Sequence, residues 1–261
     1  MSYRGAIFDV DGVLVDSPHE RAWRDTLQHL MMDEWRDILS QTSYTPEGYT
    51  TAVYQEFVAG KPRMSGARAA LDYFGIPDAE RRAVEYAERK QRHVVELIEA
   101  GEFLAFPDAL RFILAVKAAG IKVAAASSSK NAELFLKQIR LDTFADAHGL
   151  RYDFLRPGLT LLDFFDANVA GRDFPQGKPH PMIFLTAAAE LGIEPQACFV
   201  VEDASSGVQA AKAGSMTALG VARLNDEALL AEAGADLVVT TLDDVALDAL
   251  LAGRLERRRV R

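Results

Sequence analysis

Short apolar runs that stop at polar residues recur along this chain of 261 residues, and stretches of helical periodicity separate most of them. Runs of this length, bounded by polar residues, are typical of buried strands. Strands that alternate with helices predict right-handed crossovers and a parallel sheet with helices on both faces, which is an α/β fold. The runs interpreted as strands are residues 6–8, 121–126, 164–169, 197–201, 216–221 and 236–240.

Between the first and the second of these runs, the pattern changes. Residues 17–106 contain no strand-like run, and apolar residues recur there at helical spacing, most clearly over residues 81–100. We therefore predict two domains: a core formed by residues 1–16 and 107–261, and an all-helical insertion over residues 17–106. A helical lid next to the first strand can close over a substrate and exclude water from a hydrolysable intermediate.

Two acidic residues follow the first predicted strand. Asp9 and Asp11 are two positions apart, so on an extended backbone their side chains face the same way. Two close carboxylates repel each other unless one is protonated or a cation lies between them, and oxygen ligands favour Mg²⁺ over Zn²⁺. The segment predicts a metal site with a nucleophilic aspartate. A surface turn, in which Asp-Gly is common, is the alternative that this segment alone leaves open.

Three later segments also place polar residues directly after predicted strands or before predicted helices. Ser127 follows the run at 121–126, and hydroxyl and N–H groups at a helix start can hold a phosphate. Lys178 lies in a proline-rich loop before a helix predicted over residues 182–191. Glu202 and Asp203 form a second acidic pair after another run. Because the carboxyl ends of parallel strands share one edge of the sheet, these residues are expected to lie together.

These segments, taken in order, resemble the four signature segments of the haloacid dehalogenase superfamily of phosphotransferases. The residues that carry this resemblance are Asp9-Val10-Asp11-Gly12-Val13, Ser127, Lys178 and Glu202-Asp203. Within the superfamily, the chain is most similar to the β-phosphoglucomutase group, and the resemblance extends from residue 6 to about residue 221. The supporting residues are Asp16, Ser17, His19, Arg21, Ala22, Trp23, the segment Gly60-Lys61-Pro62-Arg63, Arg89, Lys90, and the segments 127–131 and 177–179.

The resemblance implies a Rossmann-like core with a helical cap, and a reaction in which Asp9 takes up a phosphoryl group as an aspartyl phosphate. Asp11 is implied as the general acid and base. Mg²⁺ is the implied cofactor, held by Asp9, the backbone carbonyl of Asp11, and Asp203. Glu202 is expected either to bind the ion directly or to hold a bound water.

The same resemblance assigns residues to the substrate. Lys178 is implied to compensate charge between Asp9 and the phosphoryl oxygens, and Ser127 to complete the phosphate cradle. Taken one at a time, His19, Arg63 and Lys90 are slightly better explained as residues of solvated helices and turns, and it is their joint match to the family pattern that favours a role in substrate binding. The substrate-binding residues implied are Gly12, His19, Arg63, Lys90, Ser128, Ser129, Lys130 and Asn131.

Three functions are compatible with these residues. We favour a β-phosphoglucomutase-like isomerase of carbohydrate metabolism, which converts a glycosyl 1-phosphate to the 6-phosphate. A sugar-phosphate phosphatase is the main alternative, since the two differ in whether a sugar hydroxyl or water attacks the aspartyl phosphate. A phosphorylatable switch of the receiver type is the remote non-enzymatic alternative. Receivers have no large helical lid and do not require a proton-shuttling residue such as Asp11.

Composition narrows the choice of partners and compartment. A net charge of −9 argues against a nucleic-acid or anionic-membrane surface, and the expected partner is a small phosphorylated sugar. Cys198 is the only cysteine and lies within an apolar run, so we expect a buried, inert thiol. No signal peptide or membrane span is recognised, which predicts a cytoplasmic protein. We expect a monomer or a weak homo-oligomer.

Residues 142–162 have no counterpart in the family pattern and precede the predicted strand at 164–169. A connection from a helix to a strand returns to the amino ends of the strands, whereas ligands gather at the carboxyl ends. We therefore expect a structural or subunit-contact role for this segment, rather than substrate recognition.

Overall fold

The computed structural model of the protein describes residues 2–59 and 61–258, so Gly60 of the segment compared above lies outside the described residues. The chain divides into two compact units. Residues up to Asp16 and from Leu104 onward form the first, and Ser17–Phe103 form the second.

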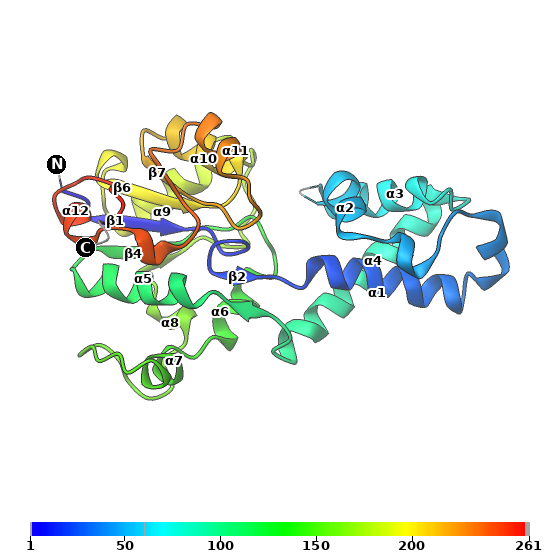
Figure 1. Ribbon diagram of the computed structural model, residues 1–261, viewed down its shortest axis with the longest axis horizontal. Helices are drawn as coiled ribbons and strands as arrows, with labels where there is room; N and C mark the ends of the chain where they lie inside the picture. The colour runs from blue at the N-terminus through cyan, green and yellow to red at the C-terminus, as the bar shows by residue number, and fades with distance from the viewer. Residues whose placement is uncertain (1, 60, 259–261) are drawn as a thin grey trace. The chain divides into compact units, whose positions relative to one another are not determined.

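The first unit is built on a six-stranded parallel sheet with the order β5-β4-β1-β6-β7-β8 (Figure 1). The α/β class and parallel sheet predicted from the apolar runs are confirmed. The strands are β1 Gly5–Phe8, β4 Lys122–Ala125, β5 Ala167–Asn168, β6 Cys198–Glu202, β7 Thr217–Val221 and β8 Leu237–Val239.

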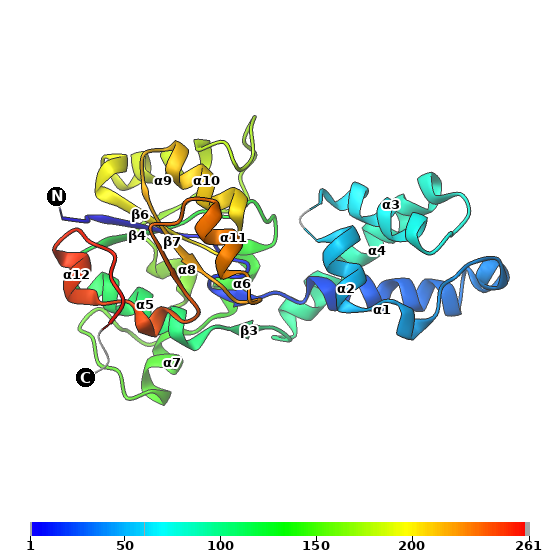
Figure 2. The same cartoon turned by 45° about the horizontal axis from the view of Figure 1, so that its top comes forward.

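Helices cover both faces of this sheet (Figures 1 and 2). On one face, Ile7 of β1 and Val200 of β6 are buried in a cluster with Phe184 of α9. On the other, Phe8 meets Phe112 of α5 at 6.2 Å between ring centroids, as expected when neighbouring strand residues face opposite ways. The helices of this unit are α5 Pro107–Ala118, α6 Ala132–Gln138, α7 Leu141–Ala147, α8 Leu161–Phe164, α9 Met182–Leu191, α10 Ser205–Ala213, α11 Glu227–Glu232 and α12 Leu247–Leu251.

The regular elements of the second unit are all helices among its described residues, and we refer to this unit as the cap. Its core contains Trp23, Leu27 and Tyr86, and the Tyr86 hydroxyl donates a 2.8 Å hydrogen bond to the Trp23 carbonyl. Its α-helices are α1 His19–Met32, α2 Thr51–Val53, α3 Arg63–Tyr73 and α4 Ala79–Glu99. Short 3₁₀ helices lie at Arg36–Gln41 and Pro46–Gly48, and a π-helical segment at Tyr54–Val58 continues α2.

The two junctions between the units lie side by side in the core. The short strands β2 Val15–Asp16 and β3 Leu104–Ala105 pair antiparallel. The Phe106 N–H adds a 2.9 Å hydrogen bond to the Leu14 carbonyl. The chain therefore leaves the core and returns to it through one hydrogen-bonded pair of segments.

One predicted strand is largely wrong. Of residues 164–169, only Ala167–Asn168 form a strand, and the preceding turn is the helix α8. The Thr160 hydroxyl accepts a 3.2 Å hydrogen bond from the Asp163 N–H and so caps this helix. A local cap outweighs a short apolar pattern because it satisfies an N–H group that the helix leaves unpaired. The prediction of a helix over residues 182–191 is confirmed by α9.

Residues 142–162 form the excursion that contains most of α7 and the loop after it. Hydrogen bonds of 2.8 to 2.9 Å close its base, from Leu141 N–H to the Leu159 carbonyl and from Leu161 N–H to the Ile139 carbonyl. The Tyr152 and Phe154 rings stack at 5.2 Å within the loop. Its structural or subunit-contact role stays a prediction.

No helix in the described part of the chain combines the length and the apolar character needed to cross a bilayer. Cys198 is a free, buried cysteine, and burial raises the pKa of its thiol to about 11. This agrees with the expected inert thiol.

Candidate active site

The register of the central strands explains why polar residues from distant segments meet. Phe8, the last residue of β1, is level with Ala125 of β4 on one side and Val201 of β6 on the other. The next residues along these strands therefore emerge at one edge of the sheet. Asp9 continues β1, and its N–H donates a 3.1 Å hydrogen bond to the Val201 carbonyl.

Lys178 links the two acidic segments. Its ammonium donates a 2.6 Å hydrogen bond to Asp9 Oδ1 and a second, short hydrogen bond to Glu202 Oε1. The same group lies 4.9 Å from the centre of the Phe184 ring. Asp9 is 6% exposed and Glu202 1% exposed, so these ion pairs are shielded from water. Lys178 is therefore positioned to offset charge on Asp9, as the sequence predicts.

Both oxygens of Glu202 have partners. Oε1 accepts from Lys178, and Oε2 accepts from the N–H groups of Asp203 and Ala204 at 3.0 and 3.1 Å. A Cβ at Gly207 would lie 1.9 Å from Oε1, so a glycine is needed where α10 approaches this carboxylate. The contacts give Glu202 a role in holding Lys178, and metal binding by Glu202 stays a prediction.

Gly12 allows the loop after β1 to approach Asp203. Its φ of +83° favours glycine, and a Cβ there would lie 1.9 Å from Asp203 Oδ2. The Gly12 N–H donates to the Val15 carbonyl at 2.8 Å and closes the turn that contains Asp11. The backbone conformation and the close approach to Asp203 thus explain why a glycine occupies position 12, while the role of Gly12 in substrate binding stays a prediction.

The cluster contains more carboxylate groups than ammonium groups, so its potential negative charge exceeds the positive charge of Lys178. Burial raises the pKa of Asp9 to about 7, with further contributions from the charges of Glu202 and Asp11, while Lys178 opposes the shift. Burial and the charges of Glu202 and Asp9 also hold the pKa of Asp203 well above its ordinary value. Burial alone would lower the pKa of Lys178, but the charges of Asp9 and Glu202 outweigh it and raise that pKa.

An excess of buried carboxylate over ammonium charge fits a divalent cation. The side chains of the cluster other than Lys178 end in carboxylate oxygens, which are the ligand atoms that Mg²⁺ prefers. Asp9, Asp203 and the carbonyl of Asp11 are the predicted ligands. Such an ion would stabilise the ionised forms of Asp9 and Asp203.

The serine-rich loop after β4 borders the same edge. Ser127 is 2% exposed, and its hydroxyl accepts a 3.1 Å hydrogen bond from the Ser129 N–H. Asn131 is buried too, whereas Ser128 is exposed. Lys130 donates to the Gly171 carbonyl at 2.8 Å and to Asp173 Oδ1 at 2.6 Å. Lys130 therefore braces this loop against residues 171–173, and its contact with substrate stays a prediction.

Of the predicted cap residues, the structure brings two together. Lys90 of α4 is 5% exposed, and its ammonium lies 3.1 Å from His19 Nδ1 and 4.9 Å from the centre of the Trp23 ring. Lys90 is therefore not one of the solvated residues of its helix. Arg63, the first residue of α3, is exposed and makes no hydrogen bond or ion pair with other described residues.

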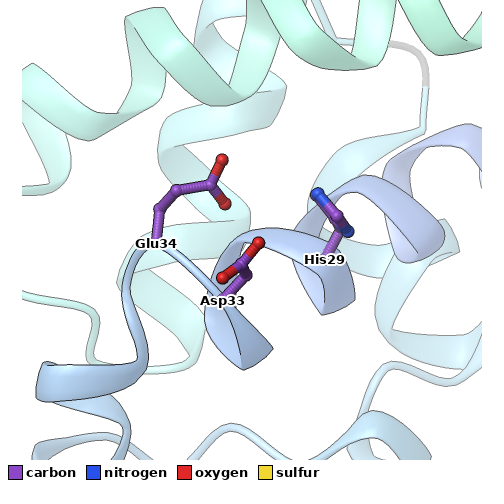
Figure 3. Close-up of side chains that lie close together, drawn as sticks. All are labelled: His29, Asp33 and Glu34. Carbon is purple, nitrogen blue, oxygen red and sulfur yellow. The ribbon is translucent and has the colours of Figure 1, made fainter.

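The cap also carries a separate polar surface that the sequence analysis did not identify. Figure 3 shows His29, Asp33 and Glu34 at the end of α1, where their ligand atoms lie within 4.8 Å of one another. All three residues are exposed, and Glu34 accepts a hydrogen bond from Arg89. His29 and Arg89 also line an open cavity of about 480 Å³ on the cap. This surface does not include His19 or Lys90.

The sequence analysis also missed an ion pair beside the loop that contains Asp11. Arg223, two residues after β7, donates to Asp108 at 2.9 and 3.2 Å. No motif marks either residue, and 115 positions separate them in the chain.

Comparisons with known proteins place these features in a family. The family model for haloacid dehalogenase-like hydrolases matches residues 3–214. The β-phosphoglucomutase of Bacillus subtilis (strain 168) is 31% identical, with 99% of this chain and 98% of the relative covered. A phosphorylated carbohydrates phosphatase of Thermotoga maritima is 32% identical, with 89% and 92% covered.

Solved structures agree with the sequence relatives. An archaeal β-phosphoglucomutase from Pyrococcus sp. strain ST 04 superimposes with a TM-score of 0.69 at 31% identity, and the match covers 96% of this chain and 99% of that one. These findings confirm the predicted resemblance and support an enzyme over a phosphorylatable switch. The chain belongs to the haloacid dehalogenase-like hydrolase family, among its phosphomutases and sugar-phosphate phosphatases.

Proposed function

We propose that the protein is a Mg²⁺-dependent phosphomutase of the β-phosphoglucomutase type, which converts a glycosyl 1-phosphate to its 6-phosphate isomer. The buried cluster of Asp9, Lys178 and Glu202 supports phosphoryl transfer through an aspartyl phosphate. The observation that carries the choice of a mutase is the partly buried contact between His19 and Lys90 in the cap. Hydrolysis alone does not require such a pair.

In the proposed first step, an Asp9 carboxylate oxygen attacks the phosphorus at the 1-position of a sugar bisphosphate, the bond to the sugar oxygen breaks, and the sugar 6-phosphate is released. Asp11 gives its proton to that leaving oxygen and is then ionised. In the second step, the 6-hydroxyl of a glycosyl 1-phosphate attacks the phosphoryl group on Asp9 and gives its proton to Asp11, while the bond from phosphorus to the Asp9 oxygen breaks and the Asp9 carboxylate is regenerated. A bound Mg²⁺ supplies positive charge next to the transferring group.

Lys178 and Ser127 act on the phosphoryl oxygens in this scheme. The Lys178 ammonium already contacts Asp9 and is held by Glu202, so it does not have to reorganise before the transfer. Lys90 and His19 are assigned to the sugar phosphate. Lys90 is buried within the cap, and its contact with the half-buried His19 holds the two groups together before substrate binds.

A sugar-phosphate phosphatase is the second candidate. The relative from Thermotoga maritima that is named a phosphorylated carbohydrates phosphatase is as similar to this chain as the mutases are. A phosphatase needs only the core cluster, with water in place of the sugar hydroxyl.

The deciding experiment measures two products. The protein is given β-glucose 1-phosphate, a catalytic amount of glucose 1,6-bisphosphate and Mg²⁺, and glucose 6-phosphate and free phosphate are followed by ³¹P NMR. We expect glucose 6-phosphate to form at least about tenfold faster than phosphate. Release of phosphate without isomerisation would replace the mutase by the phosphatase. The Asp9→Asn variant is the control for contaminating activities.

The metal assignment has its own measurement. Chelation should abolish turnover, and Mg²⁺ should restore it. The Asp203→Ala variant should need a much higher Mg²⁺ concentration for half-maximal rate, because it lacks one predicted ligand. Undiminished turnover in chelator would contradict the assignment of Mg²⁺.

A further inference from the structure

Arg223 contacts two separate segments of the core, residues 106–108 at the start of α5 and Val13 in the loop after β1. Its guanidinium donates from Nη1 to Asp108 Oδ2 at 2.9 Å and from Nη2 to Asp108 Oδ1 at 3.2 Å. Nη2 also lies 3.4 Å from the Val13 carbonyl. The plane of the group stands over the Phe106 ring, 4.0 Å from its centre. Planar side chains with a fixed fork of donors hold several partners in one geometry.

The partner of Arg223 is itself fixed. Asp108, in the first turn of α5, accepts a 2.8 Å hydrogen bond from the Leu242 N–H and a 3.1 Å hydrogen bond from the Thr241 hydroxyl. The Asp108 side chain is about 10% exposed and that of Arg223 about 15%. The position of the guanidinium is therefore determined by α5 and residues 241–242.

The other contacts of Arg223 lie on the two segments that connect the core to the cap. Val13 belongs to the outgoing segment, in the tight loop that contains Asp11 and is closed by the hydrogen bond from Gly12 N–H to the Val15 carbonyl. Phe106 belongs to the returning segment and is joined to the outgoing one through the Leu14 carbonyl. One guanidinium thus ties the loop of Asp11 and the returning segment to the rigid core.

We propose that Arg223 is a positioning residue for the general acid. By holding the Val13 carbonyl, it fixes the loop that places Asp11 next to Asp9. This inference rests on the proposed role of Asp11 as the proton donor. It does not depend on whether the acceptor is a sugar or water, because the leaving oxygen has to be protonated in both reactions.

A displaced Asp11 should affect substrates differently, according to whether their leaving group needs a proton. A sugar alkoxide is a poor leaving group and needs the proton of Asp11, whereas 4-nitrophenolate leaves without one. Loss of Arg223 should therefore slow the reaction of sugar phosphates much more than that of 4-nitrophenyl phosphate. A small displacement of a catalytic group can lower a rate by about 100-fold.

The test compares kcat and KM of Arg223→Met for both substrates, with total phosphate release and isomerisation measured together. We expect kcat/KM for the sugar phosphate to fall about 10- to 100-fold. For 4-nitrophenyl phosphate, kcat/KM reports only the steps up to release of 4-nitrophenolate, before water attacks the aspartyl phosphate, and it should fall less than about threefold. Arg223→Lys, which keeps the charge but not the fork, should give intermediate values and serves if the first variant folds poorly.

Arg111→Met is the matched control. Arg111 extends from α5, the helix that carries Asp108, and its guanidinium pairs with Asp243 through two hydrogen bonds at 2.9 and 2.5 Å, neither of which reaches a connecting segment. This variant should behave like the wild type with both substrates. An equal loss with both substrates in Arg223→Met, or no loss with either, would overturn the proposal. If the wild type only hydrolyses sugar phosphates, the mutase assignment fails while the comparison of substrates still tests Arg223.

Discussion

The core and the cap each contain a buried lysine, and the surroundings of these two lysines differ. In the core, Lys178 lies against the carboxylates of Asp9 and Glu202. In the cap, Lys90 lies against an imidazole nitrogen of His19 and the face of Trp23. The charges of the core cluster depend on one another, because burial and the charges of neighbouring carboxylates raise the pKa values of both Asp9 and Asp203. The core cluster is suited to a reaction in which negative charge shifts between groups during phosphoryl transfer. The cap pair is suited to binding a substrate group whose charge does not change.

The difference predicts two classes of effect. Changes in the core cluster should impair every reaction of the enzyme, since all of them pass through the same charged group. Changes in the cap pair should impair only reactions that depend on the sugar.

The largest effect is expected for Asp9→Asn. The amide cannot attack phosphorus, so turnover of every phosphorylated substrate should fall by at least about 10⁴-fold. The Asn carbonyl can still accept the hydrogen bond from Lys178, so the variant should fold and melt cooperatively. Steady-state rates and thermal melting measure the two parts. Substantial activity in a folded Asp9→Asn protein is incompatible with the proposed mechanism.

The core cluster was accessible from the sequence because each of its parts is encoded locally. Asp9 and Glu202 each follow a short apolar run, and the parallel register of β1 with β6 places the ends of those runs at one edge. The order of the segments then matches a family. Local patterns and a general rule of sheet topology were sufficient for these residues.

Contacts that depend on loop geometry were not accessible in this way. Arg223 and Asp108 are 115 positions apart, and Lys130 and Asp173 are 43 apart. Neither pair lies on a periodic element that would bring its members together. In the cap, periodicity indicated α4, but only the family resemblance singled out Lys90 from the charged residues around it.

The second largest effect is expected for Lys178→Met. The substitution leaves the buried carboxylates of Asp9 and Glu202 without their ammonium partner, and developing charge on the phosphoryl group loses a positioned donor. We expect kcat to fall about 10²- to 10³-fold for sugar phosphates and 4-nitrophenyl phosphate alike.

Lys117→Met is the control for this prediction. Lys117 forms a 2.6 Å ion pair with Asp166 in the same unit, away from the cluster, and its loss should leave kcat unchanged. If Lys178→Met slowed only the sugar phosphate, the core cluster would not be common to all reactions and the comparison of the two lysines would fail.

A smaller and more selective effect is expected for Lys90→Met. The variant keeps the core intact, so hydrolysis of 4-nitrophenyl phosphate should stay within about threefold of the wild type. Isomerisation of β-glucose 1-phosphate should fall about 10- to 100-fold, mainly through KM, because a charged contact with substrate is lost. The measurement is the ratio of the two rates. Arg92→Met, on the same helix, is the control, and an unchanged ratio in Lys90→Met would remove the cap pair from substrate recognition.

The smallest effect is expected for Asp108→Asn and concerns the stability of the protein. Asp108 forms an ion pair with Arg223 in the core, in which one carboxylate faces one guanidinium. Burial alone would raise the pKa of Asp108, but the hydrogen bonds from Arg223 and the Leu242 N–H outweigh it and lower that pKa. A carboxyl whose pKa is lowered by folding stabilises the protein above its unfolded pKa of about 3.9, and this stability is lost as the pH falls through the folded pKa.

The free energy of unfolding of Asp108→Asn should therefore be about 2 kcal/mol below that of the wild type at pH 7. The difference should shrink as the pH is lowered from about 5 to 3, as measured by urea denaturation. A difference that grew on acidification would mean that Asp108 is not held as a carboxylate, and the contrast with the over-charged cluster around Lys178 would then disappear.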